Sequence, residues 1–156
     1  MNKRLTRASG VFIVAIAAAQ LIRPDRANPR TDPRHAMRAG AGVESSLVAV
    51  LDRACRDCHS NDTVWPALSR VAPLSWAMAA GVSRGRQAVN FSEWNTYSLE
   101  AQRTLLSASC DDASSGTMPG IYTYVRPETR LSRQDVETIC NAARVAEAAS
   151  LAEGAK

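Results

Sequence analysis

The residues best suited to chemistry stand together in this chain as Cys55-Arg56-Asp57-Cys58-His59. Two thiols separated by two residues and followed at once by histidine form the attachment sequence of c-type haem. Two cysteines three positions apart lie within one helical turn and can reach the two vinyl groups on one porphyrin edge. The next residue then projects over the ring, where its imidazole can bind iron. The motif predicts one covalent haem c on Cys55 and Cys58, with His59 on the iron.

Three other chemistries use parts of the same motif. A thioredoxin-like redox pair has the same cysteine spacing but sits between a strand and a helix, and no strand pattern flanks this one. A four-thiolate zinc site would also need Cys110 and Cys140, a pair that lacks the usual close spacing. A structural disulfide between Cys55 and Cys58 would leave the adjacent histidine unexplained. Haem attachment is therefore the preferred interpretation.

The second iron ligand would be a methionine, a histidine or a lysine. The other histidine, His35, lies in a proline-rich stretch, and Met78 falls in an apolar helical pattern where packing explains it. Met118 stands in a polar loop, residues 114–120, and Pro119 stiffens the chain after it. We therefore predict Met118 as the distal ligand. Methionine and histidine together fill both axial positions, which favours electron transfer over oxygen or peroxide chemistry.

Two further cysteines, Cys110 and Cys140, have 29 residues between them. In an oxidising compartment two remaining cysteines most simply pair. The bridge would join the end of one helical pattern to the middle of the last one and enclose the Met118 loop. It would stabilise the fold by about 3–4 kcal/mol in the chain-entropy model. The alternative is two buried free thiols.

The first 22 residues have the pattern of an export segment. Three basic residues precede an apolar run from Val11 to Ile22 that only Gln20 interrupts, as in a secretory signal. The run is short for a membrane span, which needs roughly 20 apolar residues. Ala17 and Ala19 suit cleavage before Gln20, but the apolar run continues past that point. We expect residues 1–22 to be a signal peptide or signal anchor, and the protein to be periplasmic or anchored in the inner membrane facing the periplasm.

Composition separates the rest of the chain into a linker, a body and a tail. Residues 23–42 are rich in proline and arginine, which favours an extended linker over a helix. Residues 43–150 hold ten arginines and twelve carboxylates, so this body is not basic although the chain's net charge is +4. No basic face with interleaved aromatics indicates nucleic-acid binding. Residues 151–156 are expected to form a short tail.

The body is predicted to be an all-α, small c-type cytochrome-like helical domain, preceded by an N-terminal apolar helix and a proline-rich tether. Apolar residues make up 46% of the chain, and many are alanines, which favour helix. Apolar periodicity predicts four helices, from about Val43 to Cys58, from about Pro73 to Val89, after Ser98 and after Ser132. The two serines are good N-caps, and Asp135 nearly completes a capping box with Ser132.

Seven short motifs follow one another along residues 47–148. They are Cys55 to Asn61, Trp65-Pro66, Pro73 to Trp76, Asn90 to Trp94, Tyr97-Ser98, Met118-Pro119 with Tyr122-Thr123, and Leu131-Ser132. In this order they resemble the haem-binding domain family of small exported proteins with one CxxCH motif. The resemblance implies haem c at Cys55, Cys58 and His59, with Met118 as distal ligand. Arg126 departs from the family, which often has histidine there, so its role stays open.

We expect covalent haem c binding and one-electron transfer in the periplasm or at the outer face of the membrane. This function is that of an electron carrier, which we expect in preference to an enzyme. Its partners would be a redox protein and, if the N-terminal segment is uncleaved, the membrane. One alternative is a haem-based sensor or peroxidase-like enzyme, in which Met118 is absent from the iron or leaves it on reduction. Another is a haem-bearing subunit of a respiratory membrane complex.

Overall fold

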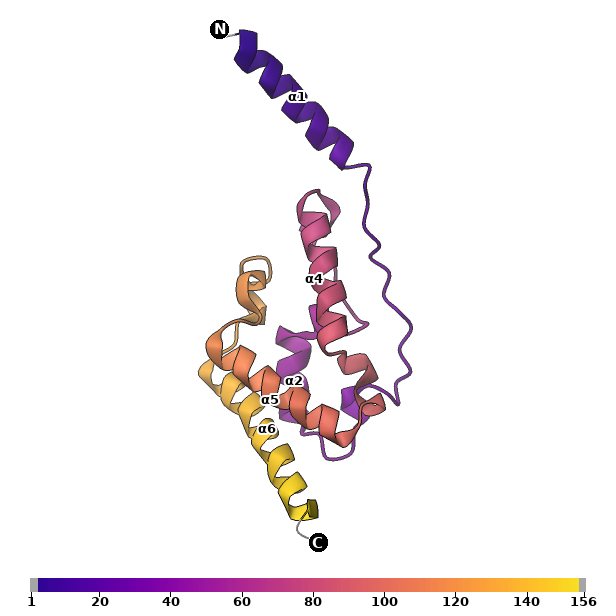
Figure 1. Cartoon of the computed structure of the whole chain (residues 1–156), viewed down its shortest axis with the longest axis vertical. Helices are drawn as coiled ribbons and strands as arrows, with labels where there is room; N and C mark the ends of the chain where they lie inside the picture. The colour runs from indigo at the N-terminus through magenta and orange to yellow at the C-terminus, as the bar shows by residue number, and fades with distance from the viewer. Residues whose placement is uncertain (1–2, 155–156) are drawn as a thin grey trace.

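The computed structural model describes residues 3–154, and helices dominate this part of the chain (Figure 1). It contains six α-helices: α1 (Lys3–Ala19), α2 (Ser45–Ala54), α3 (Arg56–His59), α4 (Leu74–Ala88), α5 (Leu99–Ser115) and α6 (Arg133–Gly154). It also contains five short 3-10 helices: η1 (Met37–Ala39), η2 (Ala67–Arg70), η3 (Phe91–Thr96), η4 (Gly120–Tyr124) and η5 (Pro127–Thr129). No β-strand occurs between residues 3 and 154, so the predicted all-α class is confirmed.

Two helix starts follow directly from local capping. The Ser98 hydroxyl accepts a hydrogen bond from the Ala101 N–H at 3.2 Å, and α5 begins at the next residue. At the start of α6, the Ser132 hydroxyl accepts from the Asp135 N–H at 3.2 Å, and the Asp135 carboxylate accepts from the Ser132 N–H at 2.7 Å. This reciprocal pair is a capping box. Both predicted starts are confirmed.

The helix predicted from Val43 to Cys58 is wrong as a single element, because the chain forms two helices there. They are separated at Cys55, whose φ of −122° leaves the helical region. The break turns α3 so that Asp57 is buried and its carboxylate accepts the Val64 N–H at 3.0 Å. This hydrogen bond, across seven residues, satisfies a backbone donor that a continued helix would leave without this partner.

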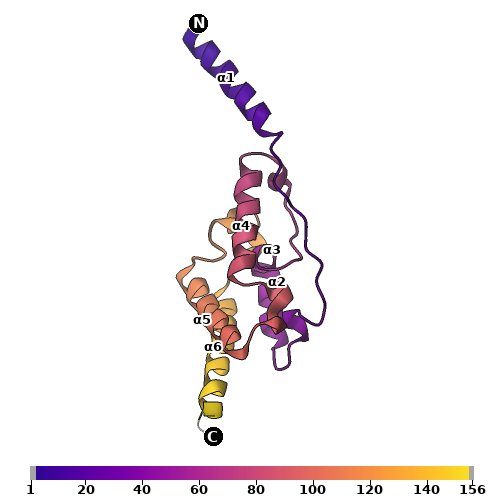
Figure 2. The same cartoon turned by 45° about the vertical axis from the view of Figure 1, so that its right-hand side comes forward.

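The hydrophobic core lies where α2, α5 and α6 meet, with η1 and η3 covering one side. Figures 1 and 2 show α5 and α6 running side by side. The core side chains come from distant parts of the sequence: Met37, Leu47, Leu51, Val89, Trp94, Leu106, Ala113 and Ile139. Burying apolar side chains contributes about 1.5–3 kcal/mol each for the larger ones, so this cluster is what holds the helices together.

The segment predicted as a linker is extended and runs alongside the body (Figure 1), to which hydrogen bonds join it. The Asn28 side chain donates to the Thr63 carbonyl at 3.0 Å, and the Asn95 side chain donates to the Ala36 carbonyl at 3.1 Å. Met37 is only 3% exposed and belongs to the core. Residues 23–37 therefore form part of the folded unit.

Helix α1 projects away from the body in both ribbon views (Figures 1 and 2). Its apolar side chains from Val11 to Val14 are 65–71% exposed. None of the helices within residues 3–154 combines the length and the apolar character that crossing a membrane requires.

Candidate functional site

The CxxCH motif spans the junction of α2 and α3. Cys55 joins the two helices, and Cys58 and His59 end α3. The two thiols are half-buried and do not form a disulfide with each other. Burial, followed by the neighbouring Cys58 charge, raises the pKa of the Cys55 thiol to about 12, and burial also raises the pKa of the Cys58 thiol. A reactive redox pair needs a lowered thiol pKa, so the environment is the opposite of the one that the thioredoxin-like alternative requires.

Helix α4 approaches the motif closely at Gly85. A Cβ atom added to Gly85 would lie 2.4 Å from the Cys58 carbonyl oxygen and 3.1 Å from the Cys58 Cβ atom. Any other residue would therefore push α4 away from α3. One turn earlier, a Cβ added to Gly81 would meet nothing within 4 Å. Gly85 is thus the position that allows the two backbones to touch.

The C-terminal end of α4 also orients the His59 ring. His59 Nδ1 lies 3.3 Å from the Val89 carbonyl oxygen. A carbonyl can only accept, so Nδ1 carries the proton and Nε2 keeps a free lone pair. Burial lowers the pKa of the imidazole, which favours this neutral form. A histidine that binds a metal commonly donates its other ring N–H to a carbonyl in this way.

Asp57, one of the two variable residues of the motif, connects it to the segment that follows Met118. Its Oδ2 atom accepts a hydrogen bond from the Tyr122 hydroxyl at 2.8 Å and lies 3.9 Å from Arg126 Nη1. The sequence analysis missed Asp57. A carboxylate between the two cysteines was the available signal, but Tyr122 and Arg126 are 65 or more residues away. The contact also gives Arg126 a position beside the motif.

Met118 lies on the exposed loop that follows α5. Gly116, at φ +73°, ends the helix, since this left-handed conformation suits glycine. The Met118 N–H donates to the Asp112 carbonyl at 3.3 Å, and the Met118 residue is 46% exposed. The Asp112 carboxylate acts on the pKa of the His59 imidazole in the opposite direction to burial, which has the larger effect. The loop leaves Met118 open to solvent.

Arg86 is a second residue that the sequence analysis missed. Its guanidinium donates to the Ser60 carbonyl at 2.8 Å, the Thr63 hydroxyl at 2.9 Å and the Asn28 side-chain oxygen at 2.9 Å. Arg86 thus joins the residues that follow His59 to the extended N-terminal segment. Nothing local marks this role, because an arginine on a helix is usually solvated.

The residues present fit a haem. Two thiols, a neutral imidazole with a free Nε2 atom and an exposed thioether form the donor set. Trp65 Nε1 is buried and has no hydrogen-bond partner among the described residues. Buried donors without an acceptor are rare, and a haem propionate would supply one. In Figure 1, α4 and η4 stand at the same end of the domain, with the α2–α3 region below them.

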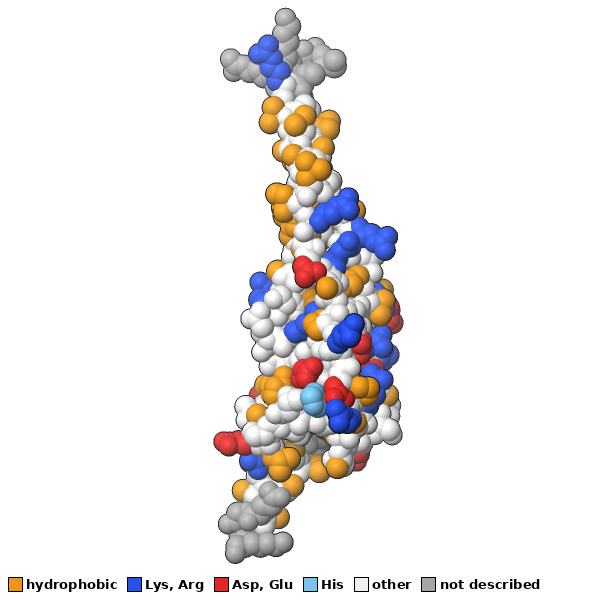
Figure 3. Space-filling view, turned by 90° about the vertical axis from the view of Figure 1, so that its right-hand side faces the viewer, with side chains coloured by type: hydrophobic (Ala, Val, Ile, Leu, Met, Phe, Trp, Pro, Cys, Tyr) orange, Lys and Arg blue, Asp and Glu red, His pale blue; other side chains and the backbone are white. Residues whose placement is uncertain are grey.

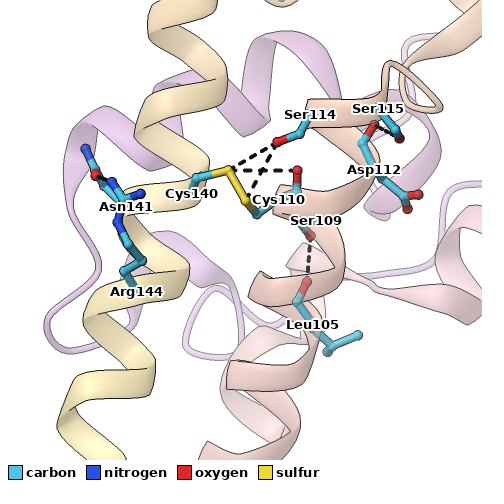
Figure 4. The surroundings of a disulfide bond; sticks show 9 residues. All are labelled: Leu105, Ser109, Cys110, Asp112, Ser114, Ser115, Cys140, Asn141 and Arg144. Carbon is cyan, nitrogen blue, oxygen red and sulfur yellow. Dashed lines mark hydrogen bonds between the residues drawn. A yellow bond between two sulfur atoms is a disulfide. The ribbon is translucent and has the colours of Figure 1, made fainter.

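Cys110 and Cys140 form a disulfide between α5 and α6 (Figure 4), with their Cα atoms 4.8 Å apart. The Ser114 hydroxyl lies 3.5 Å from the Cys140 sulfur. The four cysteines therefore do not come together as a zinc site would require. Within residues 3–154, no group of three or more histidine, cysteine or carboxylate side chains is arranged to hold a metal ion.

A family model described as a haem-binding domain matches residues 14–144. The match begins inside α1 and ends inside α6, so it includes the extended segment, the CxxCH motif and the Met118 loop. No curated protein and no solved structure matches the chain. Since the family model covers most of the 156 residues, this chain belongs to the haem-binding domain family.

Proposed function

We propose that this haem-binding domain carries one haem attached covalently through Cys55 and Cys58, with His59 and Met118 as the two iron ligands. We further propose that it transfers single electrons in the periplasm or at the outer face of the membrane. The haem iron would supply the one-electron couple. The chain would hold the iron's surroundings constant while the electron arrives and leaves.

The observation that carries the proposal is the hydrogen bond between His59 Nδ1 and the Val89 carbonyl, 3.3 Å long. A proton on Nδ1, where the carbonyl can accept it, leaves the Nε2 lone pair available to bind iron, which supports the proposal. The ring is held by Val89, which directly follows α4, while Cys55 lies between α2 and α3 and Cys58 lies in α3. The close approach at Gly85 keeps these elements together. All three residues are thus positioned by the fold.

Two features support export. The disulfide between Cys110 and Cys140 is the kind of bond that persists in an oxidising compartment. The charged and then apolar N-terminal sequence has the pattern of a secretory segment. A covalently held cofactor also suits a protein that works outside the cytoplasm, because it cannot dissociate there.

The exposure of Met118 favours a second candidate function. Its side chain is 46% exposed, on a loop outside the core. A thioether held this loosely can be absent from the iron or leave it on reduction, which opens a coordination position. The protein would then be a haem-based sensor or a peroxidase-like enzyme.

The test is an absorption spectrum of the full chain, produced with the cytochrome c maturation machinery and then extracted with acid. We expect the haem to stay with the protein, with sharp bands when reduced and a weak near-infrared methionine–iron band when oxidised. Retained haem without that band, together with CO binding, would favour the second candidate.

A pair of double variants makes the covalent claim specific. Cys55→Ala/Cys58→Ala should lose its haem on extraction. Cys110→Ser/Cys140→Ser removes the same number of cysteines and should keep it. Complete extraction of haem from the unmodified chain would overturn the covalent attachment.

A further inference from the structure

A pocket outside the haem site lies where α1 gives way to the extended segment. Its volume is about 290 Å³, and three arginines and two serines contribute to its wall: Arg23, Arg26, Arg70, Ser69 and Ser75. None of the described residues that line it is acidic. Figure 3 shows basic side chains gathered where the apolar helix meets the body.

The two walls of the pocket are locked together by hydrogen bonds. The Gln20 side chain accepts the Ala72 N–H at 3.0 Å and donates to the Ala72 carbonyl at 3.3 Å. The Trp76 indole N–H donates to the Ile22 carbonyl at 2.8 Å. Segment 20–26 is therefore fixed against segment 69–76, and the pocket is a formed feature of the fold.

The positive charges in the pocket have no anionic partner. Arg26 Nη1 donates only to neutral oxygens of Ser69, its carbonyl at 3.3 Å and its hydroxyl at 3.5 Å. Neither Arg23 nor Arg70 has a side-chain hydrogen bond or ion pair with any residue that the structure describes. The nearby Asp25 carboxylate accepts the Ala27 N–H at 2.8 Å instead. Three like charges around one cavity repel each other, and a bound anion would relieve that repulsion.

We propose that this pocket binds a phosphate group. The guanidinium fork matches phosphate oxygens and forms paired, charge-assisted hydrogen bonds with them, and the serines add uncharged donors. The phosphate could belong to the headgroup of an anionic phospholipid or be free inorganic phosphate. The pocket directly follows the apolar α1, a position suited to a headgroup. Its lining begins at Gln20, so none of residues 1–19 lines it.

The test is calorimetric titration of the haem-loaded full chain in non-ionic detergent, with dihexanoyl phosphatidylglycerol and, separately, inorganic phosphate. Arg23→Gln and Arg70→Gln should each weaken binding about tenfold, the loss expected for one charged hydrogen-bonding partner. Arg30→Gln is the matched control, because this exposed arginine of the same segment does not line the pocket. It should change the affinity by less than about twofold at matched ionic strength.

The two titrations also distinguish the sources of the phosphate. Tighter binding of phosphatidylglycerol than of phosphate assigns the site to a lipid headgroup, and equal binding assigns it to the phosphate group alone. Absence of saturable binding for both ligands would overturn the proposal. An Arg30→Gln effect as large as that of Arg70→Gln would also overturn it, since binding would then reflect overall charge. Unchanged thermal unfolding of each variant verifies that the fold is intact.

Discussion

The motif helix α3 and the Met118 loop, residues 116–124, differ in how the protein holds them. Around α3, Asp57 is buried, His59 is bonded to the Val89 carbonyl and α4 touches the Cys58 backbone through Gly85. The Met118 loop is largely exposed and is fixed mainly at its ends. One end is the last turn of α5, near the disulfide, and the other is the hydrogen bond from Tyr122 to Asp57.

This difference indicates that the fold prepares the two proposed iron ligands unequally. The histidine is oriented by the protein's own hydrogen bonds, so its position does not depend on the iron. The methionine stands on an exposed loop outside the core, so its proposed binding to the iron would depend on how well the ends of the loop are anchored. Five changes test this contrast, and they follow in order of decreasing effect.

Replacing the histidine should have the largest effect. His59→Ala removes the oriented imidazole, and we expect the chain to incorporate almost no stable haem. His35→Ala is the control, because that ring lies on the extended segment and pairs only with the surface carboxylate of Glu93 at 3.3 Å. The measurement is haem per protein by the pyridine haemochrome method. Normal haem content in His59→Ala would remove the histidine from the site.

Removing the disulfide should weaken the anchor of the Met118 loop. Cys110→Ser/Cys140→Ser should lower the free energy of unfolding by about 3–4 kcal/mol, because the bond closes a long loop between α5 and α6. Guanidinium unfolding monitored by circular dichroism measures the change. Haem content should stay the same, since the motif helix is held by other contacts. A cost below about 1 kcal/mol would show that packing alone anchors the loop.

Adding a side chain at Gly85 should disturb the packing of α4 against the motif helix α3. Gly85→Ala places a Cβ atom 2.4 Å from the Cys58 carbonyl oxygen, and overpacking of this kind costs about 1–3 kcal/mol. Gly81→Ala, in the same helix with open space around it, should instead stabilise by up to about 1 kcal/mol. Urea unfolding of both variants gives the comparison. Equal effects of the two substitutions would contradict the close approach of α4 and α3.

Breaking the connection between the two regions should cost less. Tyr122→Phe removes the hydroxyl that donates to Asp57 and leaves a buried carboxylate oxygen without this donor, at about 1–2 kcal/mol. Tyr124→Phe is the matched control, because Tyr124 is 85% exposed. The free energies of unfolding of the two variants should differ by this amount. The near-infrared band should also weaken in Tyr122→Phe alone.

Replacing the methionine should change stability least, although it should alter the spectrum of the attached haem. Met118→Ala should cost less than about 0.5 kcal/mol because the side chain is exposed, yet it should convert the haem to a high-spin or ligand-accessible form. Met78→Ala, in the half-buried part of α4, should lower stability and leave the spectrum unchanged. Identical spectra for Met118→Ala and the unmodified chain would show that Met118 is not a ligand.

Much of the fold could be predicted because its signals are local. The caps at Ser98 and Ser132 act within three residues, so both helix starts follow from the sequence alone. The prediction of a single helix through the motif failed because a side-chain contact outside the helical periodicity competes with the helix. The bond from the Val64 N–H to Asp57 lies beyond the break and favours a turn at Cys55. Periodicity could not reveal that competition.

The candidate site divides in the same way. The spacing of Cys55, Cys58 and His59 names the chemistry, since attachment depends on residue types and short distances along the chain. Arg86 and Asp57 could not be recognised, because each acts through partners that only folding brings near. The close contact of Gly85 with Cys58 likewise appears only in the folded structure.

By itself, the sequence determined the all-α class, the haem motif and the choice of Met118 as the predicted distal ligand. The tertiary structure decided which ring nitrogen of His59 is free, how the extended N-terminal segment joins the body and how Arg126 reaches the motif. The physical reason is the distance along the chain over which each interaction acts. Capping, periodicity and motif spacing act within a few residues, whereas a ring's tautomer and a guanidinium's partners depend on groups placed by packing.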